Sequence, residues 1–431
     1  MSFNDPAMWT VLIVVITIAL KVPIAISLGM TAVMIALIWG TGISMISYNF
    51  FGGIAKFPLL AIPFFVMAGV IMEKARLAEK IIDFIKLLVG PLPGGLAVAT
   101  IIVATLWGAV SGSGPATVAA LGVILIPGMV RSGYDKGFAT AVTSVSSGLS
   151  IVIPPSIAFI IYGMITNVSV GSLFIAGIVP GFLIALFLCI VTFFISKKRG
   201  YKGEPWGKPV EIWNAFKGAI WGLLTPVIIL GGIYGGIFTP TEAAAVAVFY
   251  GLFVGVFIYR TINFKTLYSI CVSAAETTAV VMLVVTCAGL FSWVATIFGL
   301  IQRASTFILA ISDTPIIILL FVNVIILLAG MMLDAISVYY VFLPILLPVM
   351  AIMGWDPLWF GVVMTVNLAI GQVTPPVAVN LYVGSNIADI SLERLAKQAL
   401  PLIGAAILAL ILIMYAPQIS LYLPRLLGLY R

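Results

Sequence analysis

Two short polar breaks interrupt long apolar stretches and hold the residues with the greatest capacity for chemistry. The first is Ser111–Pro115, with the sequence SGSGP, and the second is Gly330–Ala335, with the sequence GMMLDA. Hydroxyl and carbonyl oxygens are hard ligands that suit a hard cation. Because glycine and proline favour irregular backbone, carbonyls at such breaks are free to bind. Each break is therefore a candidate cation site, and the alternative is a packing contact of small residues between helices.

A double proline accompanies each polar break. Residues 153–156 read IPPS, and residues 374–377 read TPPV. Two adjacent prolines remove two backbone donors and leave carbonyls unpaired, so each pair predicts a discontinuous helix. In carriers built from broken helices, unwound carbonyls and half-helix ends hold Na⁺.

The four breaks together predict two cation sites. The first combines the hydroxyls of Ser111 and Ser113 with the break that follows Ser150. The second comprises the matching positions Gly330, Asp334, Gly371, Thr374 and Val377. The side chains differ between the two sites while the spacing persists, which suits backbone-carbonyl ligands. We therefore expect two or more Na⁺ ions, no cofactor and no transition metal.

Acidic residues in the apolar segments have competing interpretations. Asp334 is an intramembrane carboxylate, which is functional by default, but it also suits the N-cap of a following half-helix. Both interpretations stay open. Residues 239–242, TPTE, fit a capping box with proline at the first helical position, and we favour this over a proton carrier. The chain has no histidine, so it has no imidazole proton relay.

A substrate is expected between the two cation sites. The N-termini of half-helices carry partial positive charge and favour an anion there. No arginine lies in these motifs, so a guanidinium clamp is not evident. The candidate substrate contacts are Ser113, Thr117, Ser156, Asp334 and Asn380.

The elements that position these residues must lie in a membrane. Of the 431 residues, 63% are hydrophobic and 8% are charged, against roughly a quarter charged in soluble domains. This composition excludes a soluble enzyme, a disordered protein and a nucleic-acid-binding protein. The net charge of +7 is attributed to membrane orientation, because the cations lie between apolar runs.

The apolar runs predict helices rather than barrel strands. Residues 177–196 are apolar almost throughout, whereas barrel strands alternate apolar and polar residues. The first residues, Met1–Pro6, lack the basic region of a signal peptide, so we expect the first apolar stretch to be retained as a membrane helix.

An internal repeat links the two sets of breaks. One constant shift along the chain, without a gap, relates residues 95–185 to residues 315–406 and brings all the prolines between residues 127 and 180 onto prolines. The matched pairs are Pro127 with Pro348, Pro154 with Pro375, Pro155 with Pro376, and Pro180 with Pro401. Proline is too sparse for this agreement to arise from apolar composition alone.

The charges of matched loops predict that the repeats are inverted. In each pair one loop carries Lys or Arg and its partner carries none. The pairs are 131–136 with 352–357, 167–172 with 388–397, and 197–199 with 418–420. Under the positive-inside rule, each pair lies on opposite sides of the membrane. Inverted repeats with broken helices are typical of secondary transporters.

We therefore predict an all-α polytopic membrane protein with inverted-topology repeats and two discontinuous helices. The apolar runs beside SGSGP are too short for full spans, and cations on one side favour a re-entrant hairpin over two thin spans. Residues 1–217 form the first repeat, with a hairpin at about 95–130 and a broken helix at about 137–166. Residues 218–431 form the second, with a hairpin at about 315–349 and a broken helix at about 358–387. A connector at about 196–217 is cytoplasmic, and the N-terminus is periplasmic.

Four motifs carry a resemblance to a known family. They are FPLLAIPFF at 57–65, AVSGSGPAT at 109–117, IPPS at 153–156 and GGIFTPTEA at 235–243. The chain resembles the large membrane subunit of TRAP (tripartite ATP-independent periplasmic) transporters over nearly its whole length. The family commonly has serine where this chain has Gly114, so a side-chain ligand is absent there.

The resemblance implies a Na⁺-coupled, elevator-type importer of organic acids in the bacterial inner membrane. It also implies a small four-helix membrane subunit and a soluble extracytoplasmic binding protein as partners, and no nucleic acid. Its first Na⁺ site corresponds to Gly108, Ser111, Ser150, Ile153 and Pro154, and its second to Gly330, Gly371, Thr374 and Val377.

Other functions compete with this one. A self-sufficient Na⁺/carboxylate symporter would transport without partners. An ion channel would use the Gly/Ser tips as a filter and conduct faster than a carrier. An intramembrane enzyme is disfavoured because no nucleophile and histidine base can be assembled. C4-dicarboxylates and sialic acid both remain open as substrates.

Overall fold

The computed structural model describes residues 5–203 and 205–430, and within them every regular element is helical. The expectation about the first residues falls partly on 1–4, which lie outside the described residues. Eight of the described helices are long and apolar enough to cross a membrane. The prediction of an all-α polytopic membrane protein is confirmed.

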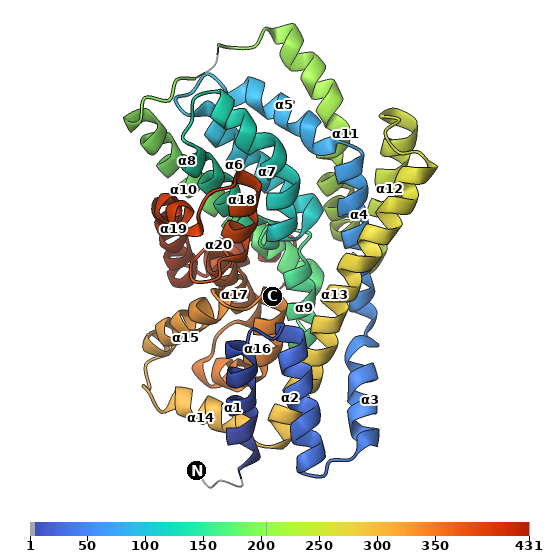
Figure 1. The fold of residues 1–431 in the computed structure, drawn as a ribbon, viewed down its shortest axis with the longest axis vertical. Helices are drawn as coiled ribbons and strands as arrows, with labels where there is room; N and C mark the ends of the chain where they lie inside the picture. Colours follow the sequence, from blue (N-terminus) through green and yellow to red (C-terminus); the bar gives the residue numbers. More distant parts are fainter. Residues whose placement is uncertain (1–4, 204, 431) are drawn as a thin grey trace.

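The helices can be divided into two groups, and the outer group runs along one side of the central group and around its two ends (Figure 1). The outer group comprises α1 (Pro6–Ala19), α2 (Ile24–Ile38), α3 (Ile43–Ile54), η1 (Phe57–Leu60), α4 (Ala61–Lys74), α5 (Leu77–Val89), α11 (Pro209–Tyr234), α12 (Pro240–Phe253), η3 (Val254–Ile258), α13 (Phe264–Ile297) and α14 (Leu300–Leu309). The central group comprises α6 (Gly95–Ser111), α7 (Gly114–Arg131), α8 (Lys136–Ser146), η2 (Ser147–Ile151), α9 (Ile157–Thr166), α10 (Val170–Lys198), α15 (Pro315–Gly330), α16 (Ala335–Met353), α17 (Pro357–Gly371), α18 (Val379–Ala388), α19 (Leu392–Tyr415) and α20 (Gln418–Leu426).

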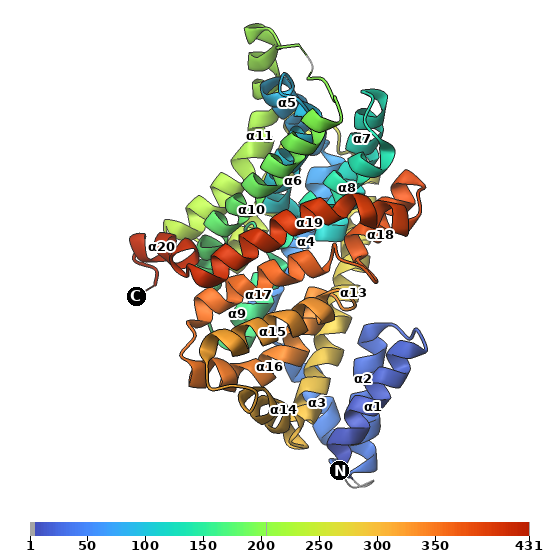
Figure 2. The same ribbon diagram turned by 90° about the vertical axis from the view of Figure 1, so that its left-hand side faces the viewer.

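The helix α13 joins the two groups. It packs against α2, α3 and α4 of the outer group and against α16 of the central group. Helices α5 and α11 lie at one end of the molecule, and α1 to α3 lie at the other (Figure 2). The central group therefore has a long neighbouring helix along one side.

The order of elements recurs with the sequence repeat. The shift that superimposes the prolines also carries the first residue of α7 onto that of α16, and the first residue of α8 onto that of α17. It carries the first residue of α3 onto that of α13, so the segment α3–η1–α4 matches a helix that continues unbroken. The same order of α-helices thus recurs, while the first repeat has a broken helix at α3–α4 and a short 3-10 helix, η2, where the second repeat has continuous α-helix.

Local caps explain several helix starts. Thr239 accepts a hydrogen bond from Glu242 N at 3.3 Å, and the Glu242 carboxylate accepts one from Thr239 N at 2.8 Å. The predicted capping box is confirmed, and it assigns Glu242 a structural role. At the N-terminus of α1, Asp5 caps the helix and pairs with Arg303. The hydrogen bond from Arg303 lowers the pKa of the Asp5 carboxyl.

The predicted connector at 196–217 is longer than the observed one. Helix α10 continues to Lys198, and α11 already begins at Pro209. Proline is favoured at a first helical position, and the Glu211 carboxylate accepts a hydrogen bond from Lys208 N at 3.0 Å. The described non-helical residues between α10 and α11 are therefore 199–203 and 205–208.

Candidate functional site

Each polar break forms a tight link between two helices. Helix α6 ends at Ser111 and α7 begins at Gly114, with Gly112 at a φ of 60°. This left-handed conformation favours glycine. The Gly112 amide donates to the Gly108 carbonyl at 3.0 Å, and the Ser111 hydroxyl donates to the Ser113 carbonyl at 3.2 Å. The tip is therefore held by its own backbone.

The first tip lies against the broken helix that follows α8. A Cβ on Gly108 would lie 2.9 Å from Ser150 Cα, so the two backbones touch. Ser150 is fully buried, and its hydroxyl donates to Thr117 Oγ1 at 2.8 Å. Gly108 and Ser150 thus form one contact between α6 and η2, and Ser111 and Ser113 are hydrogen-bonded to each other in the tip that follows α6.

Ile153 and Pro154 lie in the buried break between η2 and α9. The Ile153 side chain packs against Gly181 of α10, where a Cβ would meet Ile153 Cδ1. The side chain is thereby committed to packing. Ile153 and Pro154 can therefore offer a cation only their backbone oxygens. This agrees with the carbonyl chemistry inferred from the double proline.

The second cluster repeats this contact with glycine on both sides. A Cβ on Gly371 would lie 2.7 Å from the Gly330 carbonyl carbon. Val377 N donates to the Met331 carbonyl at 3.3 Å, and Thr374 Oγ1 donates to the Ile370 carbonyl at 2.6 Å. The structure therefore brings Gly330, Gly371 and Val377 together around the second tip, with Thr374 in the adjoining turn.

Asp334 serves as the N-cap of α16. Its carboxylate accepts hydrogen bonds from Ile336 N at 3.0 Å, Ser337 N at 3.1 Å and Ser337 Oγ at 2.6 Å. The capping interpretation, which the sequence left open against an ion-binding one, is therefore realised in the structure.

A cavity of about 290 Å³ lies where the two tips meet. Its lining includes the first residues of three helices, namely Gly114 and Pro115 of α7, Ile157 and Ala158 of α9, and Ala335 and Ile336 of α16. Helix N-termini carry partial positive charge, so their convergence favours an anion. Three valines of α13, Val280, Val281 and Val284, also line this cavity.

The predicted substrate residues divide into two sets. Ser113 and Asp334 line the cavity. Thr117 and Ser156 are buried outside its lining, because Thr117 bonds to Ser150 and the Ser156 hydroxyl donates to the Ile151 carbonyl at 2.5 Å. These two residues therefore support the breaks.

Asn380 lies behind Gly114, beside a residue that the sequence reasoning missed. A Cβ on Gly114 would meet Asn380 Oδ1 at 2.8 Å and Gln372 Oε1 at 2.8 Å. The Gln372 oxygen and both polar atoms of the Asn380 side chain are buried without hydrogen-bond partners among the described residues. Glycine at this position thus opens space for two amides beside the first tip. Gln372 could have been identified from the sequence, because it is an uncharged amide directly after Gly371 in an apolar run.

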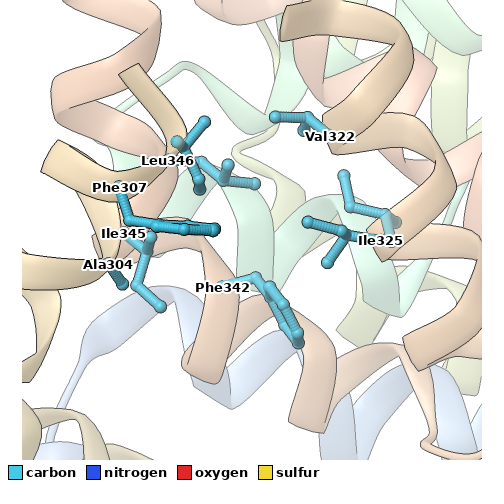
Figure 3. A pocket seen from close by; sticks show the side chains of 9 residues that line it. Ala304, Phe307, Val322, Ile325, Phe342, Ile345 and Leu346 are labelled. Carbon is cyan, nitrogen blue, oxygen red and sulfur yellow. The ribbon is translucent and has the colours of Figure 1, made fainter. Parts of the chain in front are cut away.

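A second cavity, of about 180 Å³, is wholly apolar in its described lining. The side chains of α14, α15 and α16 face one another across it (Figure 3). It is lined by hydrocarbon such as Phe307, Val322 and Phe342, and the described residues around it offer no polar side chain to orient a charged substrate. This cavity is not suited to an organic anion.

The oxygen atoms that the tips could offer as ligands suit a hard cation. Within the described residues no cluster of three or more His, Cys, Asp or Glu side chains could hold a metal ion. The groups that do converge are hydroxyl, amide and backbone oxygens. Such oxygen ligands suit Na⁺ better than a transition metal.

Known proteins resemble this chain in sequence. Residues 11–419 match the family described as tripartite ATP-independent periplasmic transporter, DctM component. The isethionate TRAP transporter permease DctMQ of Oleidesulfovibrio alaskensis is 42% identical over 93% of this chain, which spans 64% of that relative's length. The C4-dicarboxylate large permease DctM of Vibrio cholerae is 39% identical over 94% of both chains. The sialic acid large permease SiaM of the same species is 39% identical over 90% of both chains.

The fold also resembles a solved structure. The YdaH transporter of Alcanivorax borkumensis has a TM-score of 0.65 at 15% identity, covering 96% of this chain and 100% of that one. At this identity the likeness supports the fold alone. The similar curated proteins are transport permeases, in agreement with a transport role rather than an enzymatic one. The chain therefore belongs to the DctM component family of TRAP transporters, which are multi-pass membrane transport proteins.

Proposed function

We propose that this chain is the large membrane subunit of an importer that moves a small organic acid into a bacterium with a Na⁺ gradient. It works in the inner membrane with a small membrane subunit and receives substrate from a soluble extracytoplasmic binding protein. The observation that carries the proposal is the cavity between the two tips, where three helix N-termini meet and the described lining holds no Lys or Arg.

Because the described lining of the cavity holds no Lys or Arg, bound Na⁺ would supply the positive charge that an anionic substrate needs. An anion in this cavity is attracted by partial charges of helix ends, which are each worth about 0.3–1 kcal/mol at exposed sites, and it is opposed by the Asp334 carboxylate in the same lining. Cations bound at the Gly108–Ser150 and Gly330–Gly371 contacts, one on each broken helix, would supply full charges. Substrate binding would then depend on bound Na⁺, which is the requirement for coupling.

Access to the cavity would alternate by sliding of the central group against the outer group. The pairs α6–α7 and α15–α16 would be re-entrant hairpins from opposite sides of the membrane, as the charges of matched loops indicate. The valines of α13 that face the cavity belong to the helix shared by both groups, and a branched apolar surface would allow sliding without broken hydrogen bonds.

The test is uptake into proteoliposomes that contain this chain, its small subunit and the cognate binding protein. Radiolabelled succinate, isethionate and N-acetylneuraminate would be presented with and without an inward Na⁺ gradient. We expect uptake of one acid only with Na⁺ and the binding protein. Equal uptake without the binding protein would support the self-sufficient symporter, and uptake unaffected by the Na⁺ gradient would refute coupling.

A further inference from the structure

Three cavities follow one another along the same helix, α13. The first contacts Ser273 and Thr277, the second is the cavity between the tips at Val280 and Val284, and the third contacts Ser292. At 1.5 Å per residue, Thr277 and Ser292 are about 22 Å apart along the axis. The cavity between the tips therefore has one neighbouring cavity on each side.

The third cavity is the largest of these, at about 520 Å³, and it is lined in part by polar groups. They include Tyr48, Asn49, Lys56, Ser292 and Tyr340. Lys56 is the one charged residue in its described lining, and no described carboxylate forms an ion pair with it. The cavity thus presents an unneutralised ammonium group between the outer and central groups.

Lys56 lies where the two repeats differ. Helix α3 ends at Ile54 and η1 begins at Phe57, so Lys56 falls in the interruption, whereas the matching Thr277 lies inside continuous α13. Lys56 is exposed and lies directly before the candidate span Phe57–Lys74, so its ammonium group is open to water. The break places the Lys56 side chain at the cavity, while its counterpart carries no charge.

The cavity at Ser273 and Thr277, on the other side of the cavity between the tips, has an acidic residue in its lining instead of a basic one. It has a volume of about 210 Å³ and contacts Thr277, Ser111 and Glu73. The Glu73 carboxylate is paired with Lys74 at 3.4 Å. Its described lining contains no Lys or Arg, so Lys56 is the one cationic residue in the described linings of the three cavities.

We propose that the Lys56 cavity is an anion-recruiting vestibule. A carboxylate or sulfonate binds beside Lys56 and then passes to the cavity between the tips. This step rests on the proposed function and adds a site to it. The vestibule takes a small organic anion rather than a cation or a neutral solute, because the ammonium attracts anions and the adjoining hydroxyl, phenol and amide groups can orient their oxygens.

The first experiment measures uptake in the complete system with the acid that the wild-type protein accepts. Lys56→Gln should lower uptake about tenfold at subsaturating substrate (about 1.4 kcal/mol) and much less at saturation. Lys56→Arg should stay close to wild type. Lys21→Gln is the matched control, since Lys21 is a cation in the turn between α1 and α2 outside this cavity, and it should have no effect.

A second experiment remains informative if Lys56→Gln folds poorly. Lys56→Cys treated with an aminoethyl thiosulfonate regains a positive side chain and should regain uptake, whereas a sulfonatoethyl reagent should not restore it. The transported acid, added without the binding protein, should slow modification of Lys56→Cys. It should not slow modification of the exposed native Cys271, which lies outside the cavity lining.

The outcomes separate the two proposals. No uptake by the wild-type protein would overturn the proposed function itself. Wild-type uptake with an unaffected Lys56→Gln variant, or with no protection of Lys56→Cys, would overturn the vestibule alone. Weakened binding-protein association without substrate protection would assign Lys56 to docking and would also overturn the vestibule.

Discussion

Replacing Gly371 with alanine tests the contact that holds the second tip against its broken helix. The added Cβ would lie 2.7 Å from Gly330 C, 2.9 Å from Gly330 Cα and 3.0 Å from Gly330 O. Carbon atoms pack favourably at about 3.5–4.0 Å, so the two backbones must separate by about 1 Å. No side-chain rotation can relieve the clash, because every atom met is backbone.

The magnitude follows from two opposing effects. Overpacking of this kind costs about 1–3 kcal/mol. Alanine in place of glycine within a helix returns about 0.5–1 kcal/mol. We therefore expect a net loss of about 0–2.5 kcal/mol in the free energy of unfolding. A shift of about 1 Å also exceeds the tolerance of about 0.2 Å in metal–ligand distance, so Na⁺ activation should weaken by about tenfold or more.

The assay combines thermal unfolding at a series of Na⁺ concentrations with Na⁺-dependent uptake. Gly404→Ala is the matched control, because Gly404 also lies in a helix and a Cβ there meets nothing within 4 Å. The control should be neutral or slightly stabilised with unchanged Na⁺ activation. If Gly371→Ala behaves like Gly404→Ala in both measurements, the tip contact is not a cation site.

Two further substitutions address the roles of single side chains. Asp334→Ala should lose about 1 kcal/mol of stability with the cap of α16, whereas Asp334→Asn keeps a capping oxygen and should be nearly as stable as wild type. If Asp334 also binds Na⁺, Asp334→Asn will weaken Na⁺ activation in uptake despite its normal melting temperature, and an unchanged activation curve will leave it a cap only. Ser111→Ala removes a hydrogen bond to the Ser113 carbonyl and should raise the half-saturating Na⁺ concentration more than it lowers the melting temperature; equal Na⁺ curves would exclude the hydroxyl as a ligand.

The sequence predicted the elements around the breaks closely because breaks have strong local causes. Glycine, serine and aspartate interrupt the apolar runs at these two places, so the links after Ser111 and Gly330 could be placed from residue type, although prolines such as Pro127 and Pro348 lie inside helices. The capping box at Thr239 was equally local, since its two partners are close neighbours in the chain. The connector was predicted less well, because charged residues occur both in loops and in the first turns of helices such as α11.

The site depended on contacts between segments far apart in the chain. Gly114, in the first repeat, approaches Gln372 and Asn380 in the second, and no local pattern encodes that meeting. Asp334 was ambiguous in sequence because a carboxylate can cap a helix or bind an ion, and only the structure shows the hydrogen bonds of the cap.

By itself the sequence determined a helical membrane chain, a twofold repeat and the positions of its breaks. These follow from composition, hydropathy and proline, which act over short stretches of the chain. Only the tertiary structure decided which helix ends converge on one cavity, which glycines touch backbone and that Lys56 faces a cavity. The physical reason is that charge and cavity shape depend on packing between distant helices, which the sequence specifies only through the complete fold.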